Sequence, residues 1–247
     1  MKTLAAILHY NTPEYTDVLY EMLETDVDTF NTDLIVIDNG SHSGKESKYN
    51  TYKLDENVYF GGGLNSAMDL MMQDEDYSSL LFLNSDLIVG RKFISALRCA
   101  AIHHDISTPC IIQPEKTQNH WQQMLPWGST DIVRTVEWID LQCPLISRNF
   151  IKYLWEHRTS DNYIDPLFIR GWGLDIYFGI LAKQANMQTG VVDSVPAVHL
   201  GSATLKVLGN TNEYCRLAEE GMYEFFKKNG LMNDFIDMRN WAESYKV

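Results

Sequence analysis

The sequence has no apolar run close to the roughly eighteen residues that a membrane-spanning helix needs. Its first apolar run, residues 4–8, stops at His9 and is followed by Asn11 and Pro13. We interpret this run as a buried strand and not as a secretory signal, because a signal needs a longer apolar region. The sequence therefore predicts a soluble, cytoplasmic protein without a transmembrane segment.

Basic residues are scarce, with 20 Lys and Arg against 33 Asp and Glu and a formal net charge of −13. Binding to nucleic acid or to an anionic membrane depends largely on Lys and Arg, so neither is expected as the main partner. The sequence also lacks a C-x-x-C pair or a Cys-His pattern typical of structural zinc. We therefore expect free thiols at its four cysteines, Cys99, Cys110, Cys143 and Cys215.

The N-terminal part alternates short apolar runs with a helical pattern. Residues 3–10 and 33–40 are typical of buried strands, and residues 13–27 between them have the pattern of a helix. Such a strand-helix-strand crossover implies parallel strands, whose carboxyl ends form the ligand crevice. We therefore expect residues 9–12 and 38–41 to lie side by side at that edge.

The remaining pattern predicts one domain with a helical tail. Strands are expected at 51–60, 78–89, 107–114, at the start of 136–156 and over 188–201, and helices at 64–73, 91–104, the end of 136–156, 174–186 and 212–230. We predict a domain over residues 1–205, with halves at 1–100 and 101–205, followed by a helical extension over 206–247.

Three consecutive glycines, Gly61, Gly62 and Gly63, lie between an expected strand and an expected helix. They either form a sharp turn that needs positive φ or let the backbone approach a nucleotide closely. The dinucleotide pattern G-x-G-x-x-G does not fit, because these glycines are contiguous and do not follow the first strand. A P-loop is excluded because Lys and Ser or Thr do not follow in its spacing.

Five motifs occur in one order along residues 3–204: "ILHYNTPEYT", "VIDNGSHSG", "NVYFGGGLNSAM", "LLFLNSDLIV" and "AVHLGSAT". Together they resemble the GT-A glycosyltransferases of family 2, in particular their rhamnosyltransferase-like branch. The resemblance implies a Rossmann-like α/β fold with a mostly parallel central sheet flanked by helices. It implies further that residues 1–100 form the nucleotide-sugar-binding half of the domain and residues 101–205 the acceptor and metal half. It also implies a hexosyl- or pentosyltransferase with a UDP- or dTDP-sugar as the expected donor and a glycan, in preference to nucleic acid, as acceptor.

The resemblance places the nucleotide-sugar along the D-N-G-S and F-G-G-G segments, where the missing side chains of the glycines would make room for it. Local alternatives stay open, because Asp38 suits a turn, Asn65 a helix cap and Trp172 a core aromatic. The residues expected to bind the donor or substrate are Tyr10, Asn11, Asp38, Asn39, Ser41, Phe60, Gly61, Gly62, Gly63, Asn65, Asn84 and Trp172.

The strand end "LNSD" corresponds to the D-x-D metal motif of these enzymes, with Asn84 in place of the first acid and Asp86 at the second. The resemblance implies that Asp86 and His199 hold Mn²⁺ or Mg²⁺, although His199 alone also suits a buried structural role. A divalent cation would neutralise the diphosphate leaving group. The general base of an inverting transfer is expected to be Asp175, in "GWGLD", which otherwise caps a helix.

Two other functions stay open. A sugar nucleotidyltransferase would share the nucleotide-binding sheet, but it would carry a Gly-rich phosphate loop with basic residues after the first strand, where this sequence has "HYNTPEYT". A degenerate, non-catalytic protein that binds nucleotide-sugar or carbohydrate is favoured by the incomplete D-x-D motif and by the absence of a second acid beside Asp175.

Overall fold

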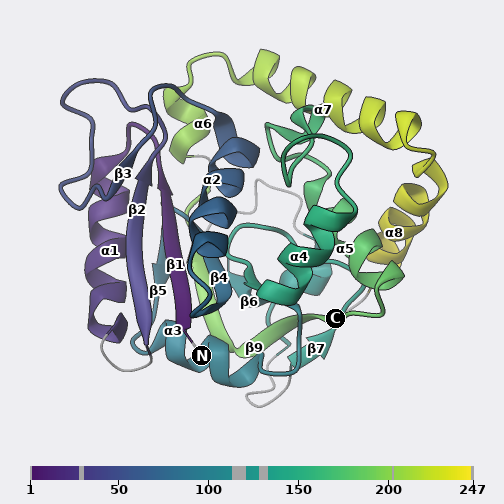
Figure 1. Cartoon of the computed structure of the whole chain (residues 1–247), viewed down its shortest axis with the longest axis horizontal. Coiled ribbons are helices and arrows are strands. Elements are labelled where there is room, and N and C mark those ends of the chain that lie inside the picture. Colours follow the sequence, from purple (N-terminus) through teal and green to yellow (C-terminus); the bar gives the residue numbers. More distant parts are fainter. Residues whose placement is uncertain (1, 28–30, 113–120, 128–132, 202, 246–247) are drawn as a thin grey trace.

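The computed structural model describes residues 2–27, 31–112, 121–127, 133–201 and 203–245 (Figure 1). Its strands are β1 (Lys2–His9), β2 (Thr32–Asp38), β3 (Tyr52–Lys53), β4 (Tyr77–Asn84), β5 (Leu87–Val89), β6 (Ile106–Ile112), β7 (Val133–Thr135), β8 (Leu145–Ser147) and β9 (Thr189–His199). Its α-helices are α1 (Pro13–Val27), α2 (Tyr59–Gln73), α3 (Phe93–Ala100), α4 (Arg148–Glu156), α5 (Leu174–Gln184), α6 (Ala203–Val207), α7 (Thr211–Lys228) and α8 (Met232–Ser244). Two short 3₁₀ turns are η1 (Gln122–Met124) and η2 (Pro166–Phe168).

The strands of the described residues form one sheet in the order β3-β2-β1-β4-β8-β6-β9-β5, with β7 paired to β9. The N-terminal strands β1 to β4 are parallel neighbours, as the crossover pattern predicts. Strand β8 inserts antiparallel between β4 and β6, and β5 and β7 pair antiparallel with β9. The predicted α/β architecture, a central sheet flanked by helices, is confirmed.

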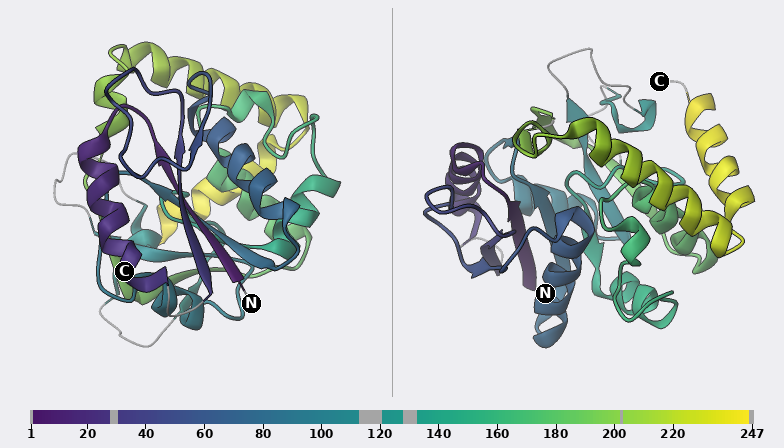
Figure 2. Two further views of the ribbon diagram at one scale, coloured as in Figure 1. Left: turned by 60° about the vertical axis from the view of Figure 1, so that its left-hand side comes forward. Right: turned by 90° about the horizontal axis from the view of Figure 1, so that it is seen from above.

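Helices cover both faces of the sheet. Helix α1 packs on β2 and β5, and α2 packs on β4 and β1 from the opposite side (Figures 1 and 2). The C-terminal helix α7 packs on η2, and α8 packs on α5. Phe225, Phe226 and Phe235 of these two helices are buried in the same core cluster as the sheet, so the C-terminal region is an integral part of the packing.

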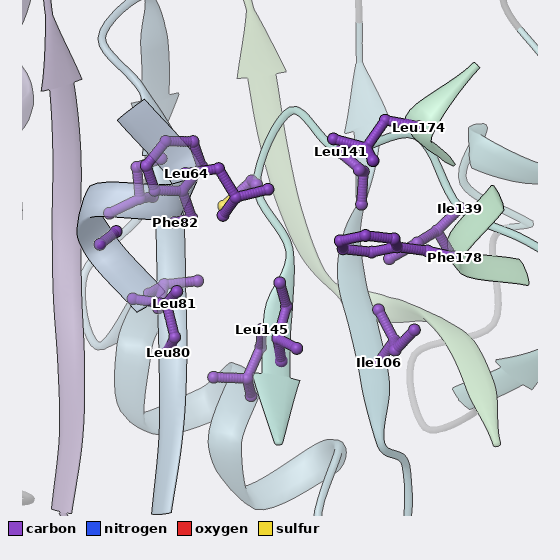
Figure 3. Close-up of a cluster of buried hydrophobic side chains, with 14 of the residues drawn as sticks. Leu64, Leu80, Leu81, Phe82, Ile106, Ile139, Leu141, Leu145, Leu174 and Phe178 are labelled. Atoms are coloured by element: carbon purple, nitrogen blue, oxygen red, sulfur yellow. The ribbon is translucent and has the colours of Figure 1, made fainter. Parts of the chain in front are cut away.

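The core is aliphatic near β4 and aromatic toward the C-terminal helices. Leu80, Leu81 and Phe82 of β4 lie in a cluster with Leu145 of β8 and Phe178 of α5 (Figure 3). Buried side chains of this size each contribute roughly 1.5–3 kcal/mol relative to leaving them exposed. This packing fixes the strand ends from which the polar residues discussed below project.

Two sequence predictions of local structure are wrong. The strand expected at 51–60 is only β3, because α2 begins at Tyr59 and includes Gly61, Gly62 and Gly63 in its first turn. The run 78–89 divides into β4 and β5 around a turn at Ser85 and Asp86. By contrast, the helix predicted over 13–27 has those bounds, and Gly230, with φ of +70°, follows α7 as predicted. Residues 113–114 of the strand expected at 107–114 lie outside the described residues.

In the part of the chain that the structure describes, every helix is too short or too polar to cross a bilayer. The four cysteines are free thiols, as predicted.

Candidate functional site

A cavity of about 670 Å³ lies at the carboxyl ends of the parallel strands and extends beneath the C-terminal helices. Its walls come from segments far apart in the sequence: the residues after β1 and β2, the start of α2, the β4–β5 turn, residues 140–142 and 170–176, the end of β9, and helices α7 and α8. Such a crevice is where open α/β sheets bind ligands. Of the residues that the sequence predicts as site residues, the cavity is lined by Tyr10, Asn39, Phe60, Asn84, Asp86, Trp172, Asp175 and His199.

Asp86 and His199 are brought together by the antiparallel pairing of β5 with β9, in which Leu87 lies opposite His199. The Asp86 Oδ1 atom lies 3.1 Å from His199 Nε2, and both side chains are buried. Burial is the largest single effect and works against the charged forms, but the hydrogen bond between the two side chains and the charges around them together outweigh it. The pKa of Asp86 is lowered and that of His199 is raised. The pair is therefore charged over a wider pH range than either group alone.

Asp86 is also held from the backbone. Its Oδ2 atom accepts a hydrogen bond of 3.2 Å from the amide of Ala203, and its carbonyl accepts one of 2.9 Å from the amide of Leu200. The segment after β9 thus holds both the side-chain carboxylate and the backbone carbonyl of Asp86.

Asp175 lies in the first turn of α5 and lines the cavity, to which it is partly exposed. Burial by the surrounding protein raises its pKa, and the nearby carboxylate of Asp140 raises it further, to about 7. The helix begins after Gly173, so Asp175 is not its N-cap, although its Oδ1 atom accepts a hydrogen bond of 2.9 Å from the amide of Ile176. A carboxyl group with this pKa can exchange a proton near neutral pH.

Asp140, from the segment before β8, is the second carboxyl group in this part of the cavity. Burial raises its pKa, opposed by His199 and by Gln142, whose amide donates a hydrogen bond of 2.8 Å to Asp140 Oδ2. Residues 141 and 174, next to the two acids, belong to one apolar cluster (Figure 3). The charge of Asp140 thus acts both on Asp175 and on His199 of the Asp86–His199 pair.

The segment Gly171-Trp172-Gly173 places an indole ring at the cavity wall. Both glycines have positive φ, +90° and +78°. A Cβ atom on Gly171 would lie 2.8 Å from the Phe60 ring, and one on Gly173 would lie 2.5 Å from Met222 Cγ. Only glycine satisfies both conditions. Trp172 between them is 41 % exposed, so the alternative of a core aromatic is wrong.

The D-N-G-S turn lies beside the end of β1, as predicted. The Asn11 amide donates a hydrogen bond of 2.9 Å to Ser41 Oγ, and the His42 amide donates one of 2.8 Å to Asn11 Oδ1. Asp38 is fully buried and accepts a hydrogen bond of 2.9 Å from the Ser41 amide. Asp38, Asn11 and Ser41 do not line the cavity. In this structure they shape the turn, and their binding to the donor stays a prediction.

Asn39 lines the cavity, but its amide group is occupied by protein. Its Oδ1 atom accepts a hydrogen bond from the Val58 amide, and its Nδ2 atom donates to Asn57 Oδ1 and to the Tyr59 carbonyl. These contacts hold Tyr59 at a φ of +57°, which is strained for a residue with a side chain. Asn39 therefore positions the ring of Tyr59 in the cavity wall.

The three glycines that the sequence predicts to make room for a donor lie against other parts of the protein. Gly61, Gly62 and Gly63 are buried within α2 and do not line the cavity. A Cβ atom on Gly61 would lie 2.7 Å from the Phe168 carbonyl oxygen, and one on Gly63 would lie 2.4 Å from Leu8 Cδ1. The missing side chains make room for other segments of the protein. The next predicted residue, Asn65, also acts structurally, since its Oδ1 atom accepts a hydrogen bond from the Ile164 amide and it does not line the cavity.

Sequence reasoning missed several residues of the cavity wall, namely Tyr59, Asp140, Gln142, Arg170, Tyr214, Glu219, Tyr223 and Arg239. Tyr59 lies within the motif "NVYFGGGLNSAM" but was not singled out there, and the others lie outside the five motifs. Their positions depend on how α7, α8 and the segment before β8 pack on the sheet. This packing cannot be predicted from the order of charged and aromatic residues along the chain.

No protein-family model matches the sequence, and no curated protein sequence matches it either. Solved structures share its fold. GalNAc-T7, crystallised with UDP, GalNAc and Mn²⁺, aligns with a TM-score of 0.59 and 11 % identity over 81 % of this chain and 44 % of its own. TarS of S. aureus aligns with a TM-score of 0.55 and 14 % identity over 92 % of this chain and 44 % of its own.

Both structures are GT-A glycosyltransferases, and this chain has the GT-A fold that the sequence predicted. It matches less than half of the length of either protein. At these identities the likeness establishes the fold and leaves the activity to be argued from the site.

Proposed function

We propose that this protein is an inverting glycosyltransferase that moves a sugar from a nucleoside-diphosphate sugar to an acceptor hydroxyl. The observation that carries the proposal is Asp175, a carboxyl group with a pKa raised to about 7, which shares a cavity with the Asp86–His199 pair. The GT-A fold and the UDP bound by GalNAc-T7 support a nucleotide-sugar donor, with UDP- or dTDP-sugars as the first candidates. The five sequence motifs support family 2 and its rhamnosyltransferase-like branch.

Inverting transfer needs one base and one displacement. An acceptor oxygen attacks the anomeric carbon as the bond from that carbon to the diphosphate oxygen breaks, and the nucleoside diphosphate leaves with the bonding electrons. Asp175 takes the proton of the acceptor hydroxyl. A base with a pKa near the working pH is suited to this, since it is largely deprotonated and still holds the proton well once it has taken it.

Asp86 and His199 suit a divalent metal ion. Two neighbouring ligands of an octahedral ion, each about 2.1 Å from it, are about 3 Å apart, and Asp86 Oδ1 lies 3.1 Å from His199 Nε2. Within the described residues no group of three or more His, Cys, Asp or Glu side chains is arranged to hold a metal. The remaining ligands would come from the donor diphosphate and water, as is usual for Mg²⁺. A bound Mn²⁺ or Mg²⁺ would stabilise the negative charge of the leaving diphosphate.

The cavity wall contributed by α7 and α8 suits the acceptor. Trp172 and Tyr223 expose ring surface there, 41 % and 38 % of each residue, and Glu219 and Arg239 supply polar groups beside them. Aromatic faces with adjacent hydrogen-bonding groups are suited to a sugar ring. A glycan is therefore the proposed acceptor.

The alternatives are less well supported. The residues directly after β1, Tyr10, Asn11 and Thr12, include neither Gly nor a basic side chain, which a nucleotidyltransferase would use to hold a triphosphate. A non-catalytic binding protein would gain nothing from a carboxyl group whose pKa is raised to about 7.

The test is transfer from a panel of UDP-, dTDP- and GDP-sugars, each with Mn²⁺, with Mg²⁺ and with excess chelator. Asp175→Asn keeps the size of the side chain and removes its basicity, so we expect donor binding to survive and transfer to fall by about 10²- to 10⁴-fold. Asp86→Ala should remove the metal-dependent part of the activity. Transfer by Asp175→Asn at the rate of the wild type would refute the role of Asp175.

A further inference from the structure

Arg170 is a cation in the cavity wall that no sequence motif singled out. Its guanidinium carbon lies 4.8 Å from the ring centre of Tyr59 and 5.9 Å from that of Tyr214. The two rings come from opposite ends of the sequence, the start of α2 and the start of α7, and both line the cavity. Aromatic faces attract a guanidinium group and fix the orientation of its plane.

The backbone beneath Arg170 is held just as closely. The Tyr214 hydroxyl donates a hydrogen bond of 2.8 Å to the Arg170 carbonyl. The Gly61 amide donates one of 2.8 Å to the Ile169 carbonyl, and this approach is open only because Gly61 lacks a Cβ atom. Gly171, on the other side of Arg170, packs against Phe60 for the same reason. The glycines of α2 therefore act on the cavity indirectly, by placing Arg170.

Arg170 has hydrogen-bonding capacity that the protein does not use. Its Nε atom is buried without a hydrogen-bond partner. Within the described residues, no carboxylate oxygen forms an ion pair with it at 4.0 Å or less. The charge of Arg170 lowers the pKa of Glu213, but Arg216 has the larger effect on that pKa. Leaving a buried donor unpaired is unfavourable, and an anionic ligand would remove that cost.

A cation near the phosphates would offset the acidic side chains of the cavity, whose lining also includes Arg239. The lining carries four acidic side chains, Asp86, Asp140, Asp175 and Glu219. These would repel a nucleoside diphosphate unless a fixed positive charge lay near its phosphates. A guanidinium group packed against aromatic rings can still offer its N–H groups to two phosphate oxygens at once.

We infer that Arg170, packed against the rings of Tyr59 and Tyr214, binds the diphosphate of the donor and stabilises its charge as it leaves. The inference rests on the proposed glycosyl transfer and adds to it a phosphate ligand that belongs to the protein itself. Because Arg170 acts without the metal ion, its contribution persists when the metal is removed.

The experiment measures nucleotide binding by calorimetry for the wild type, Arg170→Gln and Arg170→Lys. The probes are UDP, dTDP, GDP, ADP and CDP and the matching nucleosides, each with Mn²⁺ and with excess chelator. The control is Arg158→Gln, because Arg158 also stacks on an aromatic ring, with its guanidinium carbon 3.9 Å from the ring centre of Trp155, but neither residue lines the cavity. The melting temperature of each variant verifies that it is folded.

We expect Arg170→Gln to weaken diphosphate binding by about 10- to 100-fold, with and without metal, and to leave nucleoside binding unchanged. Arg170→Lys keeps the charge without the planar fork and should lie between the wild type and Arg170→Gln. Arg158→Gln should bind like the wild type. If the wild type binds a diphosphate and Arg170→Gln binds it equally well, the inference is wrong and the proposed function stands. If the wild type binds none of the five diphosphates, both fail.

Discussion

The carboxylate of Asp140 lies close enough to Asp175 to raise its pKa, in addition to the effect of burial. The two acids come from different parts of the chain, the segment before β8 and the first turn of α5. Both line the same cavity and neither is paired with a Lys or Arg by an ion pair in the described part of the chain. Two like charges in one partly buried site favour keeping a proton on one of them. This relationship gives the first two predictions.

Replacing Asp140 by Asn removes a negative charge from beside Asp175. The pKa of Asp175 should then fall from about 7, and the acidic limb of the pH profile of kcat/KM should move to lower pH, on the order of one pH unit. Asp140→Glu keeps the charge and serves as the control. An acidic limb that stays in place in Asp140→Asn would show that Asp140 does not act on the base.

The raised pKa of Asp175 also predicts how stability depends on pH. The folded state holds this proton up to about pH 7, whereas the unfolded chain loses it near the ordinary value of 3.8. Between these values the folded state binds more protons, so the free energy of unfolding falls as the pH rises. Asp175→Asn abolishes this loss. In urea denaturation, the free energy of unfolding of Asp175→Asn relative to that of the wild type should increase by on the order of 2 kcal/mol from pH 5 to pH 8. A difference that stays constant over this pH range would contradict the raised pKa.

The local pattern of the sequence predicted the elements whose packing follows from their own residues. The helix at 13–27 and the parallel β1–β2 pair follow from one amphipathic segment between two apolar runs. The division of 78–89 was not predictable from that pattern, because Leu87, Ile88 and Val89 continue the apolar run but pair with β9, more than a hundred residues later.

The site was predictable only where a residue belongs to a recognisable motif. Asp86, Asp175 and His199 were singled out by their resemblance to known motifs, and all three line the cavity. Asp140 and Arg170 were missed because their positions arise from contacts between distant segments. The glycines were assigned to a ligand because the sequence does not show that Phe168, Val58 and Leu8 fill the space beside them.

Gly61→Ala tests the packing that places Arg170. The new methyl group would lie 2.7 Å from the Phe168 carbonyl oxygen, so the backbone there must shift. We expect a loss of stability of about 1–3 kcal/mol, the range for an overpacked core, together with weaker nucleotide binding. Gly90→Ala is the control, because Gly90 has nothing within 4 Å of the added atom. Equal melting temperatures of Gly61→Ala and Gly90→Ala would contradict this packing role of Gly61.

A buried ion pair between Arg134 and Asp193 joins β7 to β9, with Arg134 Nε 2.6 Å from Asp193 Oδ2. Arg134 also donates a hydrogen bond of 3.2 Å to the hydroxyl of Tyr245, at the end of α8. Asp193→Ala leaves the guanidinium group buried without its counter-charge, which should destabilise the fold by about 3–5 kcal/mol in urea denaturation.

The exposed pair of Glu21 and Lys48, 2.7 Å apart, is the comparison for that ion pair. Glu21→Ala should change the free energy of unfolding much less than Asp193→Ala does, because water already screens this interaction. If Asp193→Ala and Glu21→Ala lower the free energy of unfolding equally, the burial of the Arg134–Asp193 pair does not increase its contribution to stability.

Trp172 should serve the acceptor and not the donor. Its ring lies at the cavity wall between Gly171 and Gly173, next to the α7–α8 side of the cavity. Trp172→Ala removes a stacking face, which should raise the KM for the acceptor by about 10-fold while the affinity for the nucleotide stays the same. Trp155→Ala is the matched control, since Trp155 is 39 % exposed, close to the 41 % of Trp172, but does not line the cavity. Steady-state kinetics with each substrate varied in turn separate the two effects. A change confined to the donor would place Trp172 on the nucleotide side and remove it from the acceptor site.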